Sequence, residues 1–459
     1  MNKRIFKYTF LVLSIMCCLL ISVFSILQAY SFMSYDVNNS PSTTKSTTLE
    51  AENTQFTNTD NSTAITNSSD ANLPATDSSD ISKSNTNSSK SSYEATSVDN
   101  AAIPSQKKQE HAPSKSITIS AVGDLMAHKS NLNSAYNTKT GTYDFSGFLE
   151  YVAPYLQKSD LTIGNFETVT AGASSDYTSF PRFNTPDSIL TALSNVGFDV
   201  LSTANNHCLD RGINGLTRTI KKIKENKMTN IGSSIDGKNK YTIKEINGIK
   251  VSILSYSYAF NGNDASLKTK QKNTYLSPIN ETQIKTDIKS VKTQGTDVVI
   301  VVIHWGTEYQ RNPNTAQTSL SKKMFSWGAD IILGSHPHVI QKSEIVKVNG
   351  KNKFIIYSMG NFISGYRRGD KAKRPNKIYT EDGVIIQLKI EKYPNGETLL
   401  KNVDYIPTWV DKNYVNNRPV FKILPIPDAI FNEPYITNRN KDFVKQSYKN
   451  TMNIMAKLK

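Results

Sequence analysis

The chain has 459 residues and only three cysteines. Two of them, Cys17 and Cys18, lie in an apolar N-terminal run, so the rest of the chain has a single cysteine and a fold held by internal disulfides is excluded. The formal net charge of +15 is uneven: residues 1–7 carry +3, residues 34–115 carry −4, and residues 116–459 therefore carry +16. A domain this basic attracts polyanions, with nucleic acid, anionic wall polymer and polycarboxylate as candidates, unless it merely has a lysine-rich surface.

Residues 1–33 are predicted to form a membrane anchor. Lys3, Arg4 and Lys7 precede an uncharged apolar run from Tyr8 to Ala29, which is roughly the 20 residues that a helix needs to cross a bilayer. The basic cluster predicts a cytoplasmic N-terminus, and we therefore expect a single-pass protein of the cell membrane with its main domain outside the cell. A cleaved signal peptide is the alternative, but no clear small-x-small cleavage site follows the run.

Residues 34–115 are predicted to be a disordered linker. This segment consists largely of Ser, Thr, Asn and Asp and has few apolar side chains. Such a composition cannot bury enough apolar surface to offset the conformational entropy of the chain. We interpret the segment as a tether between the membrane and the folded part.

From residue 116 the pattern changes to short apolar runs that alternate with segments of helical period, which indicates an α/β domain over 116–410. A C-terminal extension over 411–459 follows. Strands are predicted at residues 116–122, 160–163, 199–204, 249–256, 297–303, 330–333, 354–358, 383–390 and 399–406. Helices are predicted at residues 145–156, 187–196, 212–225, 281–292 and 316–327.

A Gly-x-Asp sequence recurs three times between a predicted helix and a predicted strand. It starts at Gly197, Gly295 and Gly328. The glycine fits the C-cap of a helix, where a positive φ is needed, and the strand that follows ends in a polar cluster. Because ligand sites in open α/β sheets gather outside the carboxyl ends of the strands, we expect the polar clusters to meet in space.

Five of the six histidines lie at or near the ends of apolar runs. Alone, each has an ordinary explanation as a turn residue, a helix cap or a buried core histidine. Together, the imidazoles, carboxylates and amides at these strand ends predict a centre for Zn, Mn, Fe or Co and would be unusual for calcium alone. The residues concerned are Asp124, His128, Asn165, Glu167, Asn206, His207, His304, Glu308, His336, His338 and Asn361.

The same segments resemble the capsule-synthesis protein CapA family, poly-γ-glutamate biosynthesis proteins with a calcineurin-like metallophosphatase fold. The resemblance spans about residues 117–365 and implies a two-sheet β-sandwich flanked by helices. The matching segments are 121–126, 164–167, 204–212, 304–309, 334–338 and 358–362.

The resemblance implies one or two divalent metal ions (Mn, Zn or Fe) and a role for each ligand. One ion would be held by Asp124, Glu167 and His338. The other would be held by the bridging Glu167 together with Asn206, His304 and His336. His207 would be the general acid, oriented by Asp210. Two features depart from the superfamily's usual motifs: a histidine four residues after Asp124 instead of two, and a glutamate instead of aspartate at the bridging position.

The expected function is that of a membrane-anchored extracellular component of poly-γ-glutamate capsule biosynthesis or export. Whether it is an enzyme stays open: a metal-dependent hydrolase, a non-catalytic subunit that binds anionic polymer, and a general extracellular phosphoesterase are the alternatives. The expected partners are an anionic polymer such as poly-γ-glutamate, the membrane and membrane subunits of a synthase complex, but not nucleic acid. A basic segment that could handle the polymer contains Arg367, Arg368, Lys371, Lys373 and Arg374.

Overall fold

The structure, a computed structural model, describes four stretches of the chain: residues 115–238, 240–369, 376–427 and 433–458. The predicted membrane anchor lies outside these residues, and so does the predicted linker except for Lys115, which begins the first strand. Within the four stretches, no helix is both long and apolar enough to cross a bilayer.

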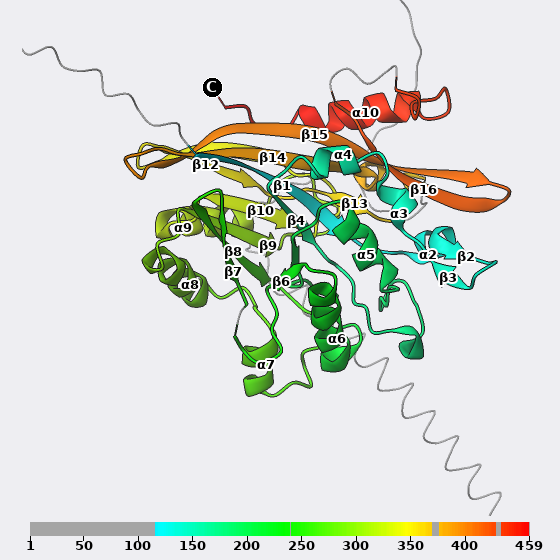
Figure 1. The fold of residues 1–459 in the computed structure, drawn as a ribbon, viewed down its shortest axis with the longest axis horizontal. Helices are drawn as coiled ribbons and strands as arrows, with labels where there is room; N and C mark the ends of the chain where they lie inside the picture. The colour runs from blue at the N-terminus through cyan, green and yellow to red at the C-terminus, as the bar shows by residue number, and fades with distance from the viewer. Residues whose placement is uncertain (1–114, 239, 370–375, 428–432, 459) are drawn as a thin grey trace, which may run out of the picture. The chain divides into compact units, whose positions relative to one another are not determined.

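The strands form two mixed sheets and a short hairpin, β2 (Tyr136–Asn137) with β3 (Thr142–Tyr143) (Figure 1). The eight-stranded sheet has the order β16 (Arg418–Pro425), β15 (Thr398–Val415), β14 (Asp382–Lys392), β1 (Lys115–Leu125), β4 (Leu161–Asn165), β5 (Val200–Ser202) and β6 (Thr229–Ile231), and β13 (Asn361–Ile363) pairs with the end of β1. The six-stranded sheet has the order β11 (Ser343–Val348), β12 (Lys351–Ile356), β10 (Ile331–Ser335), β9 (Val298–His304), β8 (Ile249–Ser257) and β7 (Thr242–Ile246).

The two sheets pack face to face, as the period-2 alternation of their strands requires. In β9, Val298, Ile300 and Val302 belong to a core shared with β1, β4 and β14 of the other sheet. The residues between them, Val299 and Val301, face outward into a second core. Both faces of the central parallel strands are therefore buried, which explains their nearly continuous apolar sequences.

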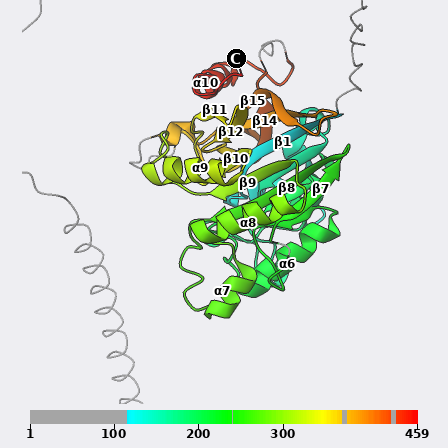
Figure 2. The same cartoon turned by 90° about the vertical axis from the view of Figure 1, so that its left-hand side faces the viewer.

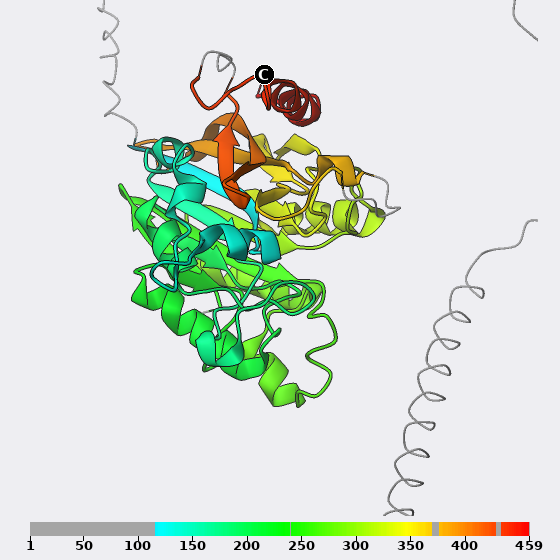
Figure 3. The same ribbon diagram turned by 90° about the vertical axis from the view of Figure 1, so that its right-hand side faces the viewer.

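Helices cover the outer faces of both sheets. The outer side of the six-stranded sheet packs against α8 (Glu281–Thr293) and α9 (Thr315–Trp327) (Figure 2). The eight-stranded sheet packs against short helices, visible from the opposite side in Figure 3: α2 (Lys129–Ala135), α3 (Ser146–Leu149), α4 (Ala153–Leu156) and α5 (Ser188–Asn195). The remaining helices are α6 (Gly212–Glu225), α7 (Thr269–Tyr275), α10 (Lys441–Met452) and the 3-10 turns η1 (Ala173–Ser175) and η2 (Lys377–Tyr379). The predicted α/β architecture with two sheets and flanking helices is thus confirmed.

Two local predictions need correction. The helix predicted over residues 145–156 is two short helices, α3 and α4, because Pro154 lies in the first turn of α4 and cannot donate to a helix that continues from α3. The helix predicted to start at Asp187 begins one residue later, and Asp187, which is its N-cap, makes no side-chain capping hydrogen bond among the described residues. Its carboxylate instead accepts two hydrogen bonds of 2.7 Å from Arg218 of α6.

The three Gly-x-Asp segments share one arrangement. Each glycine has a positive φ (94°, 75° and 117° for Gly197, Gly295 and Gly328). The aspartate then accepts a hydrogen bond of 2.8 Å from a backbone N–H of the neighbouring strand: Asp199 from Thr162, Asp297 from Lys250, and Asp330 from Val299. The repeat therefore aligns the starts of adjacent parallel strands, and their carboxyl ends meet in register, with His304 opposite Ser335.

The C-terminal residues continue the same unit. The boundary expected at residue 410 falls inside β15, whose later part pairs with β16. Helix α10 lies over β14 and β15 (Figure 1). Asn450 of α10 donates a hydrogen bond of 2.8 Å to Asp382, and Arg311 donates one of 2.9 Å to the carbonyl of Asn450.

Candidate metal centre

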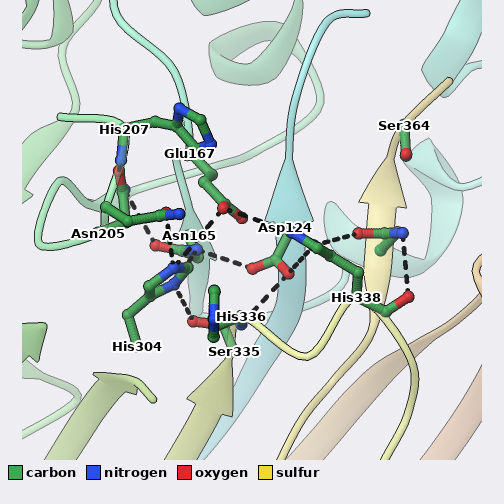
Figure 4. A network of polar contacts seen from close by, with 12 residues as sticks. Asp124, Asn165, Glu167, Asn205, His207, His304, Ser335, His336, His338 and Ser364 are labelled. Atoms are coloured by element: carbon green, nitrogen blue, oxygen red, sulfur yellow. Dashed lines mark hydrogen bonds and ion pairs between the residues drawn. The ribbon is translucent and has the colours of Figure 1, made fainter. Parts of the chain in front are cut away.

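The polar residues predicted to meet do so at the carboxyl ends of strands from both sheets (Figure 4). From the eight-stranded sheet, Asp124 lies at the end of β1 and Glu167 follows β4 by two residues. From the six-stranded sheet, His304 ends β9, and His336 and His338 lie in the turn after β10. All five side chains are buried.

The turn after β10 has a backbone that few residues adopt. His336 and His338 have φ values of 97° and 55°, in a region disfavoured for residues with a Cβ. Hydrogen bonds hold the turn: Tyr309 N–H donates to Pro337 O at 2.8 Å, and Asn361 Nδ2 donates to His338 O at 3.1 Å. Strain that is fixed by its surroundings in this way is typical of functional sites.

Two groups of side chains could each hold a metal ion. One consists of Asp124, Glu167 and His338, and the other of Glu167, His304 and His336. In each group the candidate ligand atoms lie within 4.8 Å of one another, and Glu167 belongs to both. Asn206 adds a further oxygen to the second group, since its Oδ1 lies 3.0 Å from His304 Nε2.

The state of Glu167 indicates that a cation fits between these groups. Its side chain is completely buried, and neither carboxylate oxygen has a hydrogen-bond partner among the residues that the structure describes. The nearest imidazole nitrogens, His304 Nε2 and His338 Nε2, lie 3.6 and 3.8 Å from Oε1 (Figure 4). Burial, and then the nearby charge of Asp124, raise the pKa of Glu167 well above its usual value. A buried, unpaired carboxylate is costly unless a cation compensates it.

The histidines suit metal binding as well. Burial, then the neighbouring imidazoles, lower the pKa values of His304 and His336 well below the usual range, which keeps both rings neutral as ligands must be. Nδ1 of His336 is buried, and no described residue forms a hydrogen bond with it. For His338, burial opposes protonation, but the hydrogen bond and charge of Asp124 outweigh it and raise the pKa. Mixed carboxylate, amide and imidazole ligands favour Zn, Mn or Fe over Mg or Ca.

Neutral side chains orient the candidate ligands through hydrogen bonds. Asn165 Nδ2 donates to Asp124 Oδ1 at 2.8 Å, and Ser335 Oγ lies 3.1 Å from His304 Nδ1. His338 Nδ1 lies 3.1 Å from both Asp124 Oδ2 and Asn361 Oδ1, so Nδ1 is the donor and Nε2 is the nitrogen left for a metal. The sequence placed Asn165 and Asn361 at strand ends and Ser335 in the segment 334–338, but it gave none of them a role in orienting a ligand.

His207 and Asp210 form a separate pair at the edge of the centre. His207 Nδ1 lies 2.8 Å from Asp210 Oδ2, which also accepts the Phe183 backbone N–H at 2.7 Å. Oδ2 is therefore an acceptor, Nδ1 carries the proton, and Nε2 is the nitrogen that could exchange a proton with a substrate. Asn205, which the sequence did not single out by itself, accepts the His207 backbone N–H at 3.2 Å and fixes this loop.

Aromatic side chains surround the histidines. The ring of Tyr258, which is 46% exposed, lies 4.6 Å from that of His336. Burial raises the pKa of Tyr258 to about 12, so its hydroxyl stays protonated. The ring of Phe180, which is 63% exposed, has its centroid 6.5 Å from that of His207. No spacing rule in the sequence relates these aromatic residues to the centre, and they were not predicted.

Three other predicted residues have different surroundings. His128 belongs to neither ligand group and caps α2. Arg367 and Arg368 pair with the buried Glu381 rather than standing free for a polymer, and Arg368 also lies over the ring of Phe443 at 4.8 Å. The other basic residues of that predicted segment, Lys371, Lys373 and Arg374, lie outside the described residues.

Comparison with known proteins gives the following matches. Residues 118–366, more than half of the chain, match the family model described as "Bacterial capsule synthesis protein PGA_cap". The chain is 31% identical over 310 residues to "Capsule biosynthesis protein CapA" of Bacillus anthracis, covering 65% of this chain and 68% of that protein. It is 28% identical over 322 residues to "PGA biosynthesis protein CapA" of Bacillus subtilis (strain 168), covering 67% and 77%.

Among solved structures, a calcineurin-like phosphoesterase, YfkN from Bacillus subtilis, matches with a TM-score of 0.40 and 16% identity, covering 64% of this chain and 91% of that one. The NAD nucleotidase NadN of Haemophilus influenzae matches with a TM-score of 0.38 and 13% identity, covering 75% and 57%.

Proposed function

Because the chain belongs to the bacterial capsule synthesis protein family, we propose that it acts in the production or export of an anionic capsule polymer of the poly-γ-glutamate type, through a two-metal hydrolytic or transfer centre. The relatives support the first part, since both carry capsule or PGA biosynthesis in their names. The charge of +16 over residues 116–459 suits a polyanionic partner.

One observation carries the second part of the proposal. Glu167 is shared by two groups of potential ligands, and both of its buried oxygens lack a hydrogen-bond partner. A shared carboxylate is the arrangement that two-metal hydrolytic sites use, in which the bound ions polarise the substrate and supply an activated water. Asp124 and His338 would hold one ion with Glu167, and Asn206, His304 and His336 would hold the other.

The protein's own residues would orient the substrate and move a proton. His207 would transfer a proton between Nε2 and the leaving oxygen, and the charge of Asp210 would stabilise the imidazole while it carries two protons. The hydrogen bonds that link His338 Nδ1 to Asp124 and Asn361 would hold both ligands in position during the reaction.

The cellular setting of the proposal follows from the sequence. The apolar run from Tyr8 to Ala29 and the basic residues before it support a single-pass anchor with the main domain outside the cell. An anchored domain of this kind would work beside the membrane subunits of a capsule synthase.

Metal analysis of the purified full-length protein tests the centre. We expect one or two Mn, Zn or Fe ions per chain in the wild type, and a loss of about one ion in His304→Ala and His336→Ala. His207→Asn is the matched control, since it removes an imidazole from the same site without removing a proposed ligand. A wild-type protein without stoichiometric metal would refute the two-metal centre.

Capsule formation in cells that carry His207→Asn then separates catalysis from polymer handling. Loss of polymer with metal content unchanged supports an enzyme. Normal polymer production in the same variant would favour a non-catalytic, polymer-binding subunit whose metal is structural. Rapid hydrolysis of a chromogenic phosphodiester by the purified protein would favour a general phosphoesterase.

A further inference from the structure

His128 lies beside the metal centre without belonging to either ligand group. Its ring packs between those of Phe183 and Tyr366, with centroids 5.3 and 4.6 Å away. Phe183 also packs against His207 at 4.8 Å, and Tyr366 against His338 at 5.3 Å. One aromatic ring therefore separates His128 from the proposed proton donor, and one separates it from His338 of the first ligand group.

The surroundings of His128 determine which ring nitrogen carries its proton. The backbone N–H of Gly365 donates to His128 Nδ1 at 3.1 Å. Nδ1 is therefore an acceptor, and the neutral ring has its proton on Nε2. Burial, and then the neighbouring His338 and His207, lower the pKa of His128 to about 3, so the ring is neutral at physiological pH.

The contact with Gly365 is closely fitted. A Cβ at position 365 would lie 2.5 Å from His128 Cβ and 2.8 Å from Asn131 Oδ1. Asn131 in turn accepts the His128 backbone N–H at 3.0 Å. The residues around His128 thus hold both its backbone and its Nδ1, and the ring cannot turn to offer Nδ1 elsewhere without losing the bond from Gly365.

The other nitrogen is left without a partner. His128 Nε2 is buried and makes no hydrogen bond among the described residues. The same is true of both Glu167 oxygens and of His336 Nδ1, so several of the buried unpaired atoms belong to this one site. A ring needed only for packing and for accepting the Gly365 N–H would leave its Nε2–H buried without an acceptor, which costs free energy.

We propose that His128 Nε2–H donates a hydrogen bond to an oxygen of the tetrahedral oxyanion, a phosphate or a group of similar charge and shape, that binds at the metal centre. The inference rests on the proposed function, because it requires an anion held there. His128 would contact an oxygen that the metal ions leave free, and it would fix the orientation of the group towards His207. It donates the hydrogen bond without giving up its proton.

Two substitutions test the donor itself. His128→Asn can keep an acceptor for Gly365 near the position of Nδ1 but has no donor at the position of Nε2. His128→Gln places an amide N–H near the position of Nε2. Binding of inorganic phosphate to the Mn-loaded, full-length protein is measured by titration calorimetry, together with Mn content and the thermal unfolding midpoint.

We expect His128→Asn to bind phosphate about tenfold more weakly or worse, the usual effect of losing a hydrogen bond to a charged group. His128→Gln should stay within about threefold of the wild type, and Mn content should not change in either variant. His128→Phe, which keeps a ring between Phe183 and Tyr366, provides a second donor-free variant if His128→Asn does not fold.

Wild-type affinity for phosphate in the donor-free variants would overturn the inference while leaving the proposed function intact. Equal weakening in His128→Asn and His128→Gln, or a loss of Mn in either, would also overturn it, because His128 would then serve the fold or the metal. Failure of the wild type to bind Mn, or phosphate binding that does not depend on Mn, would overturn the inference and the proposed centre together.

Discussion

Replacing the shared carboxylate by an amide, Glu167→Gln, should have opposite effects on stability with and without metal. In the metal-free protein at pH 7.5, the buried carboxylate has no hydrogen-bond partner and a pKa raised by burial and by Asp124. Glutamine removes the charge but keeps the shape. We therefore expect the metal-free variant to be more stable than the wild type by about 1–3 kcal/mol.

Metal should reverse this order. An ion that binds only the folded wild type at about 1,000 times its Kd adds about 4 kcal/mol to the free energy of unfolding. The variant lacks the shared ligand and should gain little of this. At about 2 °C per kcal/mol, differential scanning calorimetry should show the variant melting a few degrees above the wild type in EDTA and several degrees below it in Mn.

The pH dependence of the stability of the metal-free protein tests the raised pKa of Glu167 independently. Because the folded-state pKa of Glu167 lies above that of the unfolded chain, the folded state binds more protons, and the stability of the metal-free wild type falls as pH rises from about 4.5 through the folded-state pKa. The advantage of the variant should therefore shrink as the pH is lowered towards 4.5.

Glu381→Gln is the matched control. Glu381 is equally buried, but it pairs with Arg367 and Arg368 and accepts a hydrogen bond of 2.9 Å from Trp409 Nε1. Breaking a buried pair should cost about 3 kcal/mol or more, to the same extent with and without metal. A Glu167→Gln variant no more stable than the wild type in EDTA, or equal stabilisation of both proteins by Mn, would refute the assignment of Glu167 as an uncompensated shared ligand.

Three further predictions follow from the geometry. Gly334→Ala should destabilise the protein by about 3 kcal/mol or more, because the added Cβ would lie 2.0 Å from Tyr357 O and would displace the turn that carries His336. Chemical denaturation measures this loss of stability. Gly369→Ala is the control, and it should have little effect because the space around Gly369 is open. Burial lowers the pKa values of His304 and His336, so below about pH 6.5 the unfolded chain takes up protons that the folded chain does not. Each histidine should therefore make the metal-free protein less stable by about 1.4 kcal/mol per pH unit as the pH falls. Urea titrations between pH 5 and 6.5 should show a slope smaller by that amount in His304→Gln, and an unchanged slope would contradict the buried neutral state. Finally, Arg368→Glu should lower the melting temperature by several degrees whatever polymer is present, because it places a second carboxylate beside Glu381, whereas Lys401→Glu should not; equal melting temperatures would show that Arg368 is free for a partner.

Much of the fold could be predicted because its central strands are buried on both faces. Their continuous apolar runs, and glycines such as Gly197 and Gly328 at the helix ends, gave element type and order directly. The edge strands β6, β7, β11 and β16 were missed, and the burial of each is incomplete. The extent of β15 also escaped prediction, because its last six residues pair only with β16.

The candidate site was predictable to a different degree for each residue. Five candidate ligands lie within three residues of the carboxyl ends of strands, where ligand sites in α/β sheets gather: Asp124, Glu167, His304, His336 and His338. Ser335, Asn205 and Tyr258 act through contacts between segments far apart in the sequence, for which residue type and spacing carry no signal. The role of Gly365 beside His128 likewise depends on β13 lying against β1, which no local pattern reveals.

The ligands come from both sheets, and neither sheet has a complete set. Asp124 and Glu167 belong to one sheet, and His304, His336 and His338 to the other. An ion held by either ligand group would therefore contact residues of both sheets, and the full ligand set forms only when the two sheets are packed together. Once bound, the ion cross-links the sandwich. The supply of metal where the chain folds would then affect how long the folded form survives proteolysis.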